Sequence, residues 1–204
     1  FLKTYYPREF FAASMTMDLS NQSKLSEFHE ELKRINIKVI RPDINKCFAD
    51  FQFDEDNFYY ALGGIKSVGL EAISNVVSER KENGEFKSIN DFLNRVSPKD
   101  INKLQLEGLV KAGAFDNIDN NRQALFNSIP NFILKTKNIF ENKAANQIDL
   151  FASDEEQDNE IVLNIEDWNF EDRLSREFEA IGFFISDHPL NQFKEIFDDY
   201  KIVD

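Results

Sequence analysis

The spacing of apolar side chains predicts helices over most of the chain before residue 139. Residues 1–11, 20–35 and 70–81 each place apolar or aromatic side chains three or four positions apart, which is typical of a helix with one buried face. Asn83 and Gly84 end the third of these helices. The apolar residues concerned are Leu2, Tyr5, Tyr6, Phe10 and Phe11, then Leu25, Phe28, Leu32 and Ile35, then Ala72, Ile73, Val76 and Val77.

Two short aromatic runs between these helices have a different period. Residues 51–53 and 58–60 are separated by a polar stretch, a pattern that predicts two strands joined by a turn. Pro42 disfavours helix at the residue before it, so the second helix must end before this small β hairpin begins.

Cap residues predict three further helix starts. Ser88, with Asp91 three positions later, opens a short helix that reaches about Val96. Ser97 and Pro98 predict the next start, with proline at the first helical position, in a helix that runs to Leu109. Another helix begins near Asn121.

A glycine-rich loop at residues 62–69 leads directly into the helix predicted at 70–81. The first N–H groups of that helix, at Leu70 and Glu71, have no intrahelical acceptor and can bind an anion. Gly69 is expected to allow close approach of a phosphate and a positive φ. The expected phosphate-binding residues are Lys66, Ser67, Val68 and Gly69.

A second unit of helix, glycine turn and helix follows, with Gly113 placed 44 positions after Gly69. A lysine precedes the glycine in both units. In the functional interpretation both loops bind DNA phosphates without reading bases; in the alternative, both glycines only form tight helix corners. The expected contacts of the second loop are Lys111, Ala112, Gly113 and Ala114.

Charge is unevenly distributed along the 204 residues. Residues 152–204 have 4 basic and 16 acidic side chains, so −12 of the net charge of −13 lies there, whereas residues 62–143 have 12 basic and 10 acidic side chains. Since salt screens exposed charges beyond about 8–10 Å, the acidic end does not exclude DNA binding by the loops. One cysteine, Cys47, and no apolar run near the ~18 residues of a membrane span indicate a cytoplasmic protein.

Five segments in this order resemble the family of bacterial DNA polymerase III α subunits. The resemblance implies a mainly α fold, with a tandem helix-hairpin-helix domain that follows the last helices of the fingers and a small β hairpin. It also implies that the chain is a fragment of a longer polymerase. The matching segments are 3–10, 41–45, 62–69, 111–116 and 181–190. The implied divisions are 1–60 for the end of the fingers, 61–138 for the hairpin domain, 139–165 for a tether, and 166–204 for a helical connector toward an oligonucleotide-binding domain.

The same resemblance implies binding to double-stranded primer-template DNA, to the bacterial sliding clamp and to other subunits of the replicative holoenzyme. Family hairpins have glycine, an apolar residue and glycine, and here Ser67 replaces the first glycine. A near copy of the clamp motif at 123–126 lies in a predicted amphipathic helix and is expected to be core. The expected clamp-binding residues are Gln147, Ile148, Asp149, Leu150 and Phe151.

No catalytic constellation is evident in the sequence. His29 and His188 are isolated, and Cys47 has no partner at metal-ligand spacing. The resemblance places the Mg²⁺-binding carboxylates of the polymerase in the palm, so we expect neither a cofactor nor polymerase activity in this stretch. Two alternatives stay open: a helix-hairpin-helix module of a repair nuclease or ligase, and a protein-interaction scaffold.

Overall fold

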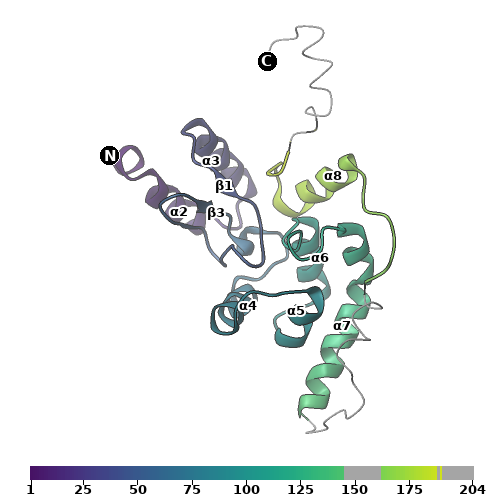
Figure 1. Cartoon of the computed structure of the whole chain (residues 1–204). Helices are drawn as coiled ribbons and strands as arrows, with labels where there is room; N and C mark the ends of the chain where they lie inside the picture. The colour runs from purple at the N-terminus through teal and green to yellow at the C-terminus, as the bar shows by residue number, and fades with distance from the viewer. Residues whose placement is uncertain (145–161, 188, 190–204) are drawn as a thin grey trace, which may run out of the picture.

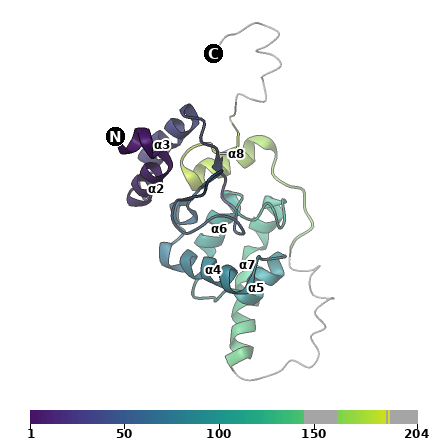
Figure 2. The same ribbon diagram turned by 60° about the vertical axis from the view of Figure 1, so that its left-hand side comes forward.

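The computed structural model describes residues 1–144, 162–187 and 189 and confirms a mainly α fold (Figure 1). α6 lies at the centre, with α8 on one side of it and α4, α5 and α7 on the other (Figures 1 and 2). α2, α3 and a small sheet form the N-terminal part. The helices are α1 Leu2–Tyr5, α2 Pro7–Met17, α3 Gln22–Arg34, α4 Leu70–Asn83, α5 Ile89–Arg95, α6 Lys103–Lys111, α7 Arg122–Ala144 and α8 Phe170–Ile181, with a 3-10 turn, η1, at Leu62–Gly64.

The predicted β hairpin is present, and one more strand joins it. β2 (Gln52–Phe53) pairs antiparallel with β3 (Phe58–Tyr59), with Phe53 opposite Phe58. β1 (Val39–Ile40) pairs parallel with the other edge of β3 and has too few residues to show a period in the sequence. The sheet therefore fastens the segment after α3 to the segment that leads into the first glycine loop.

The expectation of one continuous first helix is wrong. Pro7 has no N–H and disfavours helix at Tyr6, so the chain breaks there into α1 and α2. Phe11 is fully buried, whereas Tyr5 and Tyr6 are exposed. The apolar pattern of the sequence therefore continues from α1 into α2, but α1 has no buried side chain.

The helix starts after residue 87 confirm one cap and correct another. Ser88 Oγ accepts the N–H of Asp91 at 3.0 Å, as its spacing predicts. The helix expected from Pro98 begins instead at Lys103, and residues 98–100 form a turn. Asn102 and Gln105 cap each other reciprocally, so two terminal N–H groups have an acceptor. A start capped by Ser97 would satisfy only one such group, and the later start is therefore favoured.

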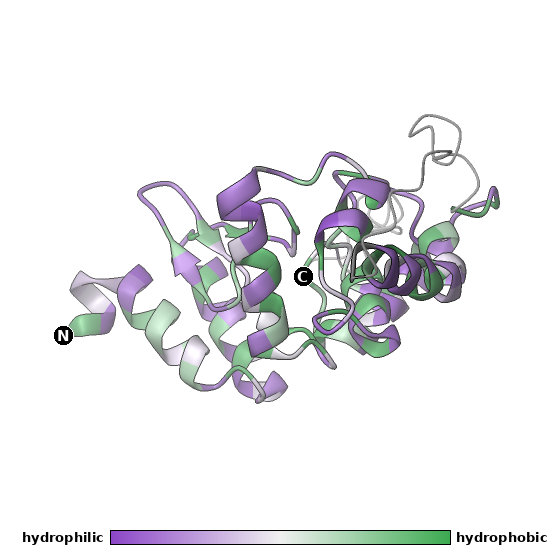
Figure 3. Ribbon diagram, turned by 90° about the horizontal axis from the view of Figure 1, so that it is seen from below, coloured by the Kyte–Doolittle hydropathy of each residue, from purple (hydrophilic) through white to green (hydrophobic). Residues whose placement is uncertain are grey.

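Buried apolar side chains from Phe11 to Phe183 form one continuous core. The ribbon coloured by hydropathy shows hydrophobic and hydrophilic residues alternating along the helices (Figure 3). The described residues of the segments expected as 1–60, 61–138 and 166–204 share this core, and their separation into domains stays a prediction. Most of the expected tether, 139–165, lies outside the described residues.

Candidate nucleic-acid interface

The first glycine loop brings the chain from η1 into α4 through one sharp turn. Ser67 has a φ of 68°, a conformation that side chains with a Cβ rarely adopt. Gly69 is the N-cap of α4 with φ −74° and ψ 133°. The expectation of a positive φ at Gly69 is therefore wrong, because the turn is made two residues earlier, at the position where the family pattern has glycine.

The start of α4 presents N–H groups to solvent. Gly69, Leu70 and Glu71 are exposed. Ile73 is the first residue whose N–H bonds back into the turn, to Gly69 O at 3.0 Å. Among the described residues, no acceptor bonds the N–H groups of Gly69, Leu70 or Glu71. The positive end of the α4 dipole thus adds to unsatisfied donors, as an anion site requires.

Packing underneath holds this first corner in place. The N–H of Lys66 donates to Ala180 O in α8 at 2.8 Å, and the N–H of Val68 donates to Ile65 O at 3.1 Å. Val68 is buried, while the Lys66 side chain is exposed. Of the four residues expected here, Val68 anchors the loop, and Lys66, Ser67 and Gly69 form its open surface.

The second corner differs because its donors are already used. The N–H groups of Ala112, Gly113 and Ala114 donate to carbonyls in the last turns of α6, at 2.9–3.0 Å. Ala112 is 3% and Ala114 1% exposed. Gly113 has a φ of 75°, which is the usual conformation of a glycine that ends a helix. This geometry favours the structural interpretation of the second loop.

Ion pairs between charged side chains cover the second corner. Arg122, with 5% of its side chain exposed, pairs with Asp116 at 2.6 Å and lies 3.8 Å from the buried Glu177 of α8. Burial acts to lower the pKa of Arg122, but Asp116 and Glu177 raise it overall. Lys111 pairs with Glu179 at 3.0 Å, also in α8. The second lysine of the sequence pattern therefore has a carboxylate partner within the fold.

The two copies of the clamp motif have different positions. Gln147, Ile148, Asp149, Leu150 and Phe151 lie outside the described residues, so this expectation stays a prediction. The near copy at 123–126 is in α7, where Ala124 and Leu125 are each 1% exposed and belong to the core, as expected, and Phe126 is partly buried against it.

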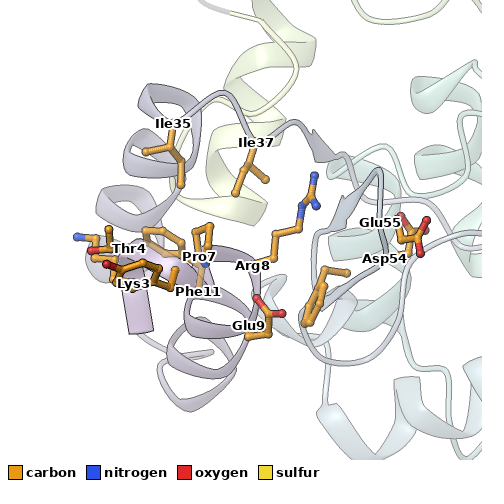
Figure 4. Close-up of a pocket in the computed structure, with 12 residues that line it drawn as sticks. Lys3, Thr4, Pro7, Arg8, Glu9, Phe11, Ile35, Ile37, Asp54 and Glu55 are labelled. Carbon is orange, nitrogen blue, oxygen red and sulfur yellow. The ribbon is translucent and has the colours of Figure 1, made fainter. Parts of the chain in front are cut away.

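A groove of about 1010 Å³ lies away from both glycine corners, and Figure 4 shows the residues that line it. It is formed by α1, α2, the segment after α3 and the β2–β3 turn, with Arg8, Ile37 and Asp54 on its walls. Among the described residues, no three His, Cys, Asp or Glu side chains gather as a metal site would need, and no helix there is long and apolar enough to cross a membrane.

Sequence comparisons place these observations in a family. A model of the helix-hairpin-helix motif matches residues 36–125. The DNA polymerase III α subunit of Caulobacter vibrioides is 41% identical over 93% of this chain, that of Campylobacter jejuni 39% over 96%, and that of Escherichia coli 34% over 96%. The chain spans 16–17% of the length of these three relatives. It therefore belongs to the family of bacterial DNA polymerase III α subunits.

Proposed function

We propose that this chain is the part of a replicative polymerase that holds duplex DNA by its backbone and attaches the enzyme to a sliding clamp. The single observation that supports DNA binding is the exposed start of α4, whose N–H groups are unbonded and which follows the exposed Lys66 by three residues. The relatives are DNA polymerases, so the reaction served is DNA-directed DNA synthesis, with its Mg²⁺-dependent chemistry outside this stretch. Holding primer-template DNA and clamp together keeps the polymerase in place over many additions.

Backbone N–H groups and one lysine can bind a phosphate, but they cannot distinguish base pairs. The first corner is therefore expected to bind DNA of any sequence with similar affinity. Because the N–H groups of Ala112, Gly113 and Ala114 are bonded within the fold, we assign the contact to the first corner alone. A site with this function must move along the duplex as synthesis proceeds. A contact that does not read bases permits such movement.

Replacing Lys66 with alanine is expected to weaken binding of this chain to duplex DNA about fivefold and to reduce the slope of log affinity against log salt by about one. The loss should be the same on unrelated sequences. Fluorescence anisotropy with labelled duplexes at several salt concentrations measures both. Lys137→Ala is the matched control, since Lys137 is exposed in the last two turns of α7, which extend away from the rest of the fold (Figure 1). A sequence-selective loss would contradict the assignment.

The clamp contact is proposed for Gln147, Leu150 and Phe151. Gln147 offers a donor and an acceptor, and two adjacent apolar side chains can fill a pocket, at about 1.5–3 kcal/mol each when fully buried. Ordering the peptide offsets much of that energy, so the affinity is modest and the contact can be released.

Changing these three residues to alanine together is expected to reduce binding to a bacterial sliding clamp at least about 100-fold, because both apolar anchors are lost. Titration calorimetry measures the affinity, and circular dichroism should show unchanged helix. The control changes Asn146, Ser153 and Gln157, which are polar neighbours in the same stretch, to alanine. Clamp binding retained in the first variant would refute this part of the proposal.

A further inference from the structure

The first corner has a neighbour from the second helical unit that the sequence did not single out. Gln105 is in the first turn of α6 and is 8% exposed. If Gly69 had a Cβ, that atom would lie 3.6 Å from Gln105 Nε2, and no other heavy atom of the described residues beyond the chain neighbours would lie within 4 Å. The amide nitrogen therefore faces the open space at the start of α4.

The orientation of this amide is fixed by its own hydrogen bonds. Oε1 accepts the N–H of Asn102 at 2.9 Å, and the N–H of Gln105 donates to Asn102 Oδ1 at 3.0 Å. Because the oxygen must face the N–H of Asn102, the NH₂ group must face Gly69. Within the described part of the chain, Nε2 has no acceptor. Although most of the side chain is buried, Nε2 keeps contact with solvent and is a free donor at the surface of the loop.

We infer that Gln105 completes the phosphate site of the first corner. This inference rests on the proposed DNA-binding function and specifies the donors of that site. An oxygen of a DNA backbone phosphate lies between Gly69 and Gln105 and accepts from Nε2 and from the free N–H groups at Leu70 and Glu71. The site therefore joins α4 to α6, and the phosphate links the two helical units.

Side chains of both charges lie in the segments that form this site, and they affect how strongly a phosphate binds. Lys66 is exposed in the same loop and attracts a phosphate, whereas the carboxylate of Glu71, in the first turn of α4, repels it. A neutral donor at position 105 adds directional hydrogen bonding without changing the net charge. Removing it should therefore lower affinity with less effect on salt dependence than removing Lys66.

Two substitutions test the inference. Gln105→Glu keeps an oxygen for the cap on Asn102, replaces the NH₂ group with a second oxygen and adds a negative charge, so affinity for duplex DNA should fall about tenfold. The salt dependence is therefore compared with that of Lys66→Ala in the charge-neutral variant, Gly69→Ala. Gly69→Ala is compatible with the backbone at this residue and places a methyl group at an ordinary contact distance from Gln105. That methyl group occupies the phosphate position, and a loss of about tenfold is expected here as well.

The matched control is Asn138→Asp, the same exchange of amide for carboxylate at an exposed position near the end of α7. It should change affinity less than twofold, and thermal unfolding should show that all three variants are folded. Unchanged DNA binding in Gln105→Glu and Gly69→Ala, with a loss in Lys66→Ala, would overturn the role of Gln105 and leave the proposed function standing. Absence of salt-sensitive DNA binding in the unchanged chain would overturn both.

Discussion

Replacing Gly113 with alanine is expected to lower the free energy of unfolding by about 4 kcal/mol. Its φ of 75° costs a residue with a Cβ about 1–2 kcal/mol. The new Cβ would also lie 2.0 Å from Arg122 Nη2 and 2.9 Å from Asp116 Oδ2, which is far inside contact distance. Arg122 cannot move aside freely, since it also bonds Lys111 O at 3.2 Å. Urea unfolding followed by circular dichroism measures the loss.

Gly84→Ala is the control for the backbone part of this effect. Gly84 has a φ of 84° but no heavy atom within 4 Å of its Cβ position. With a ψ of 176°, Gly84 has an extended conformation that essentially only glycine adopts, so its substitution should cost only conformational strain, about 1–3 kcal/mol. A larger loss at Gly113 than at Gly84 therefore gives a lower limit for how strongly the ion pairs close the second corner. Equal losses would mean that Arg122 moves without penalty, and that the corner can open.

Local signals in the sequence predicted most of the elements. Ser88 with Asp91 predicted the start of α5, and Asn83 with Gly84 predicted the end of α4. Such caps depend on residues within three or four positions of one another, so they can be read without knowing the fold. The error at Pro98 has the same origin, because two adjacent cap signals compete there and the reciprocal pair at Asn102 and Gln105 forms.

The difference between the two glycine corners could not be predicted in this way. Both show lysine, glycine and a following helix in the sequence. What separates them is α8. Its Glu177 and Glu179, more than 60 positions after Gly113, approach Arg122 and Lys111. Contacts over such separations leave no local pattern. Only the packing shows that one corner is open and the other is covered.

Gln105 was missed for a related reason. Its spacing from Asn102 is a visible cap signal, but the cap explains only Oε1 and its own N–H. The direction of the remaining NH₂ group depends on how α6 packs against the start of α4, 36 positions earlier in the chain. The sequence thus contains the reason that the side chain is rigid, and the fold determines what it faces.

His29 makes the stability of the N-terminal part depend on pH. It is 4% exposed, its ring centroid lies 5.0 Å from that of Phe183, and Nδ1 has no hydrogen-bond partner among the described residues. Burial, and then the charge of Lys33, lower the pKa of His29 from 6.5 to about 4, against an opposite effect of Glu30. The folded state therefore holds this imidazole neutral where the unfolded chain would protonate it.

The contribution of His29 is fully present above pH 6.5, where the imidazole is neutral in both states, and it falls as the pH drops from 6.5 toward 4, because only the unfolded state takes up the proton. Between pH 7.5 and pH 5 we expect the free energy of unfolding to fall by about 2 kcal/mol from this residue. Urea unfolding at both values measures the change.

His29→Phe keeps a ring against Phe183 and does not titrate. In this variant the free energy of unfolding should fall by about 2 kcal/mol less than in the unchanged protein over the same pH interval. His188 is the same in both proteins, so its contribution cancels in the comparison. The pKa of Asp54 is lowered to about 2 by its hydrogen bond from Tyr59, so that group titrates below the window. Parallel pH dependence in the two proteins would mean that the folded state admits the proton, and that the contact between α3 and the segment after α8 opens on the acid side of neutrality.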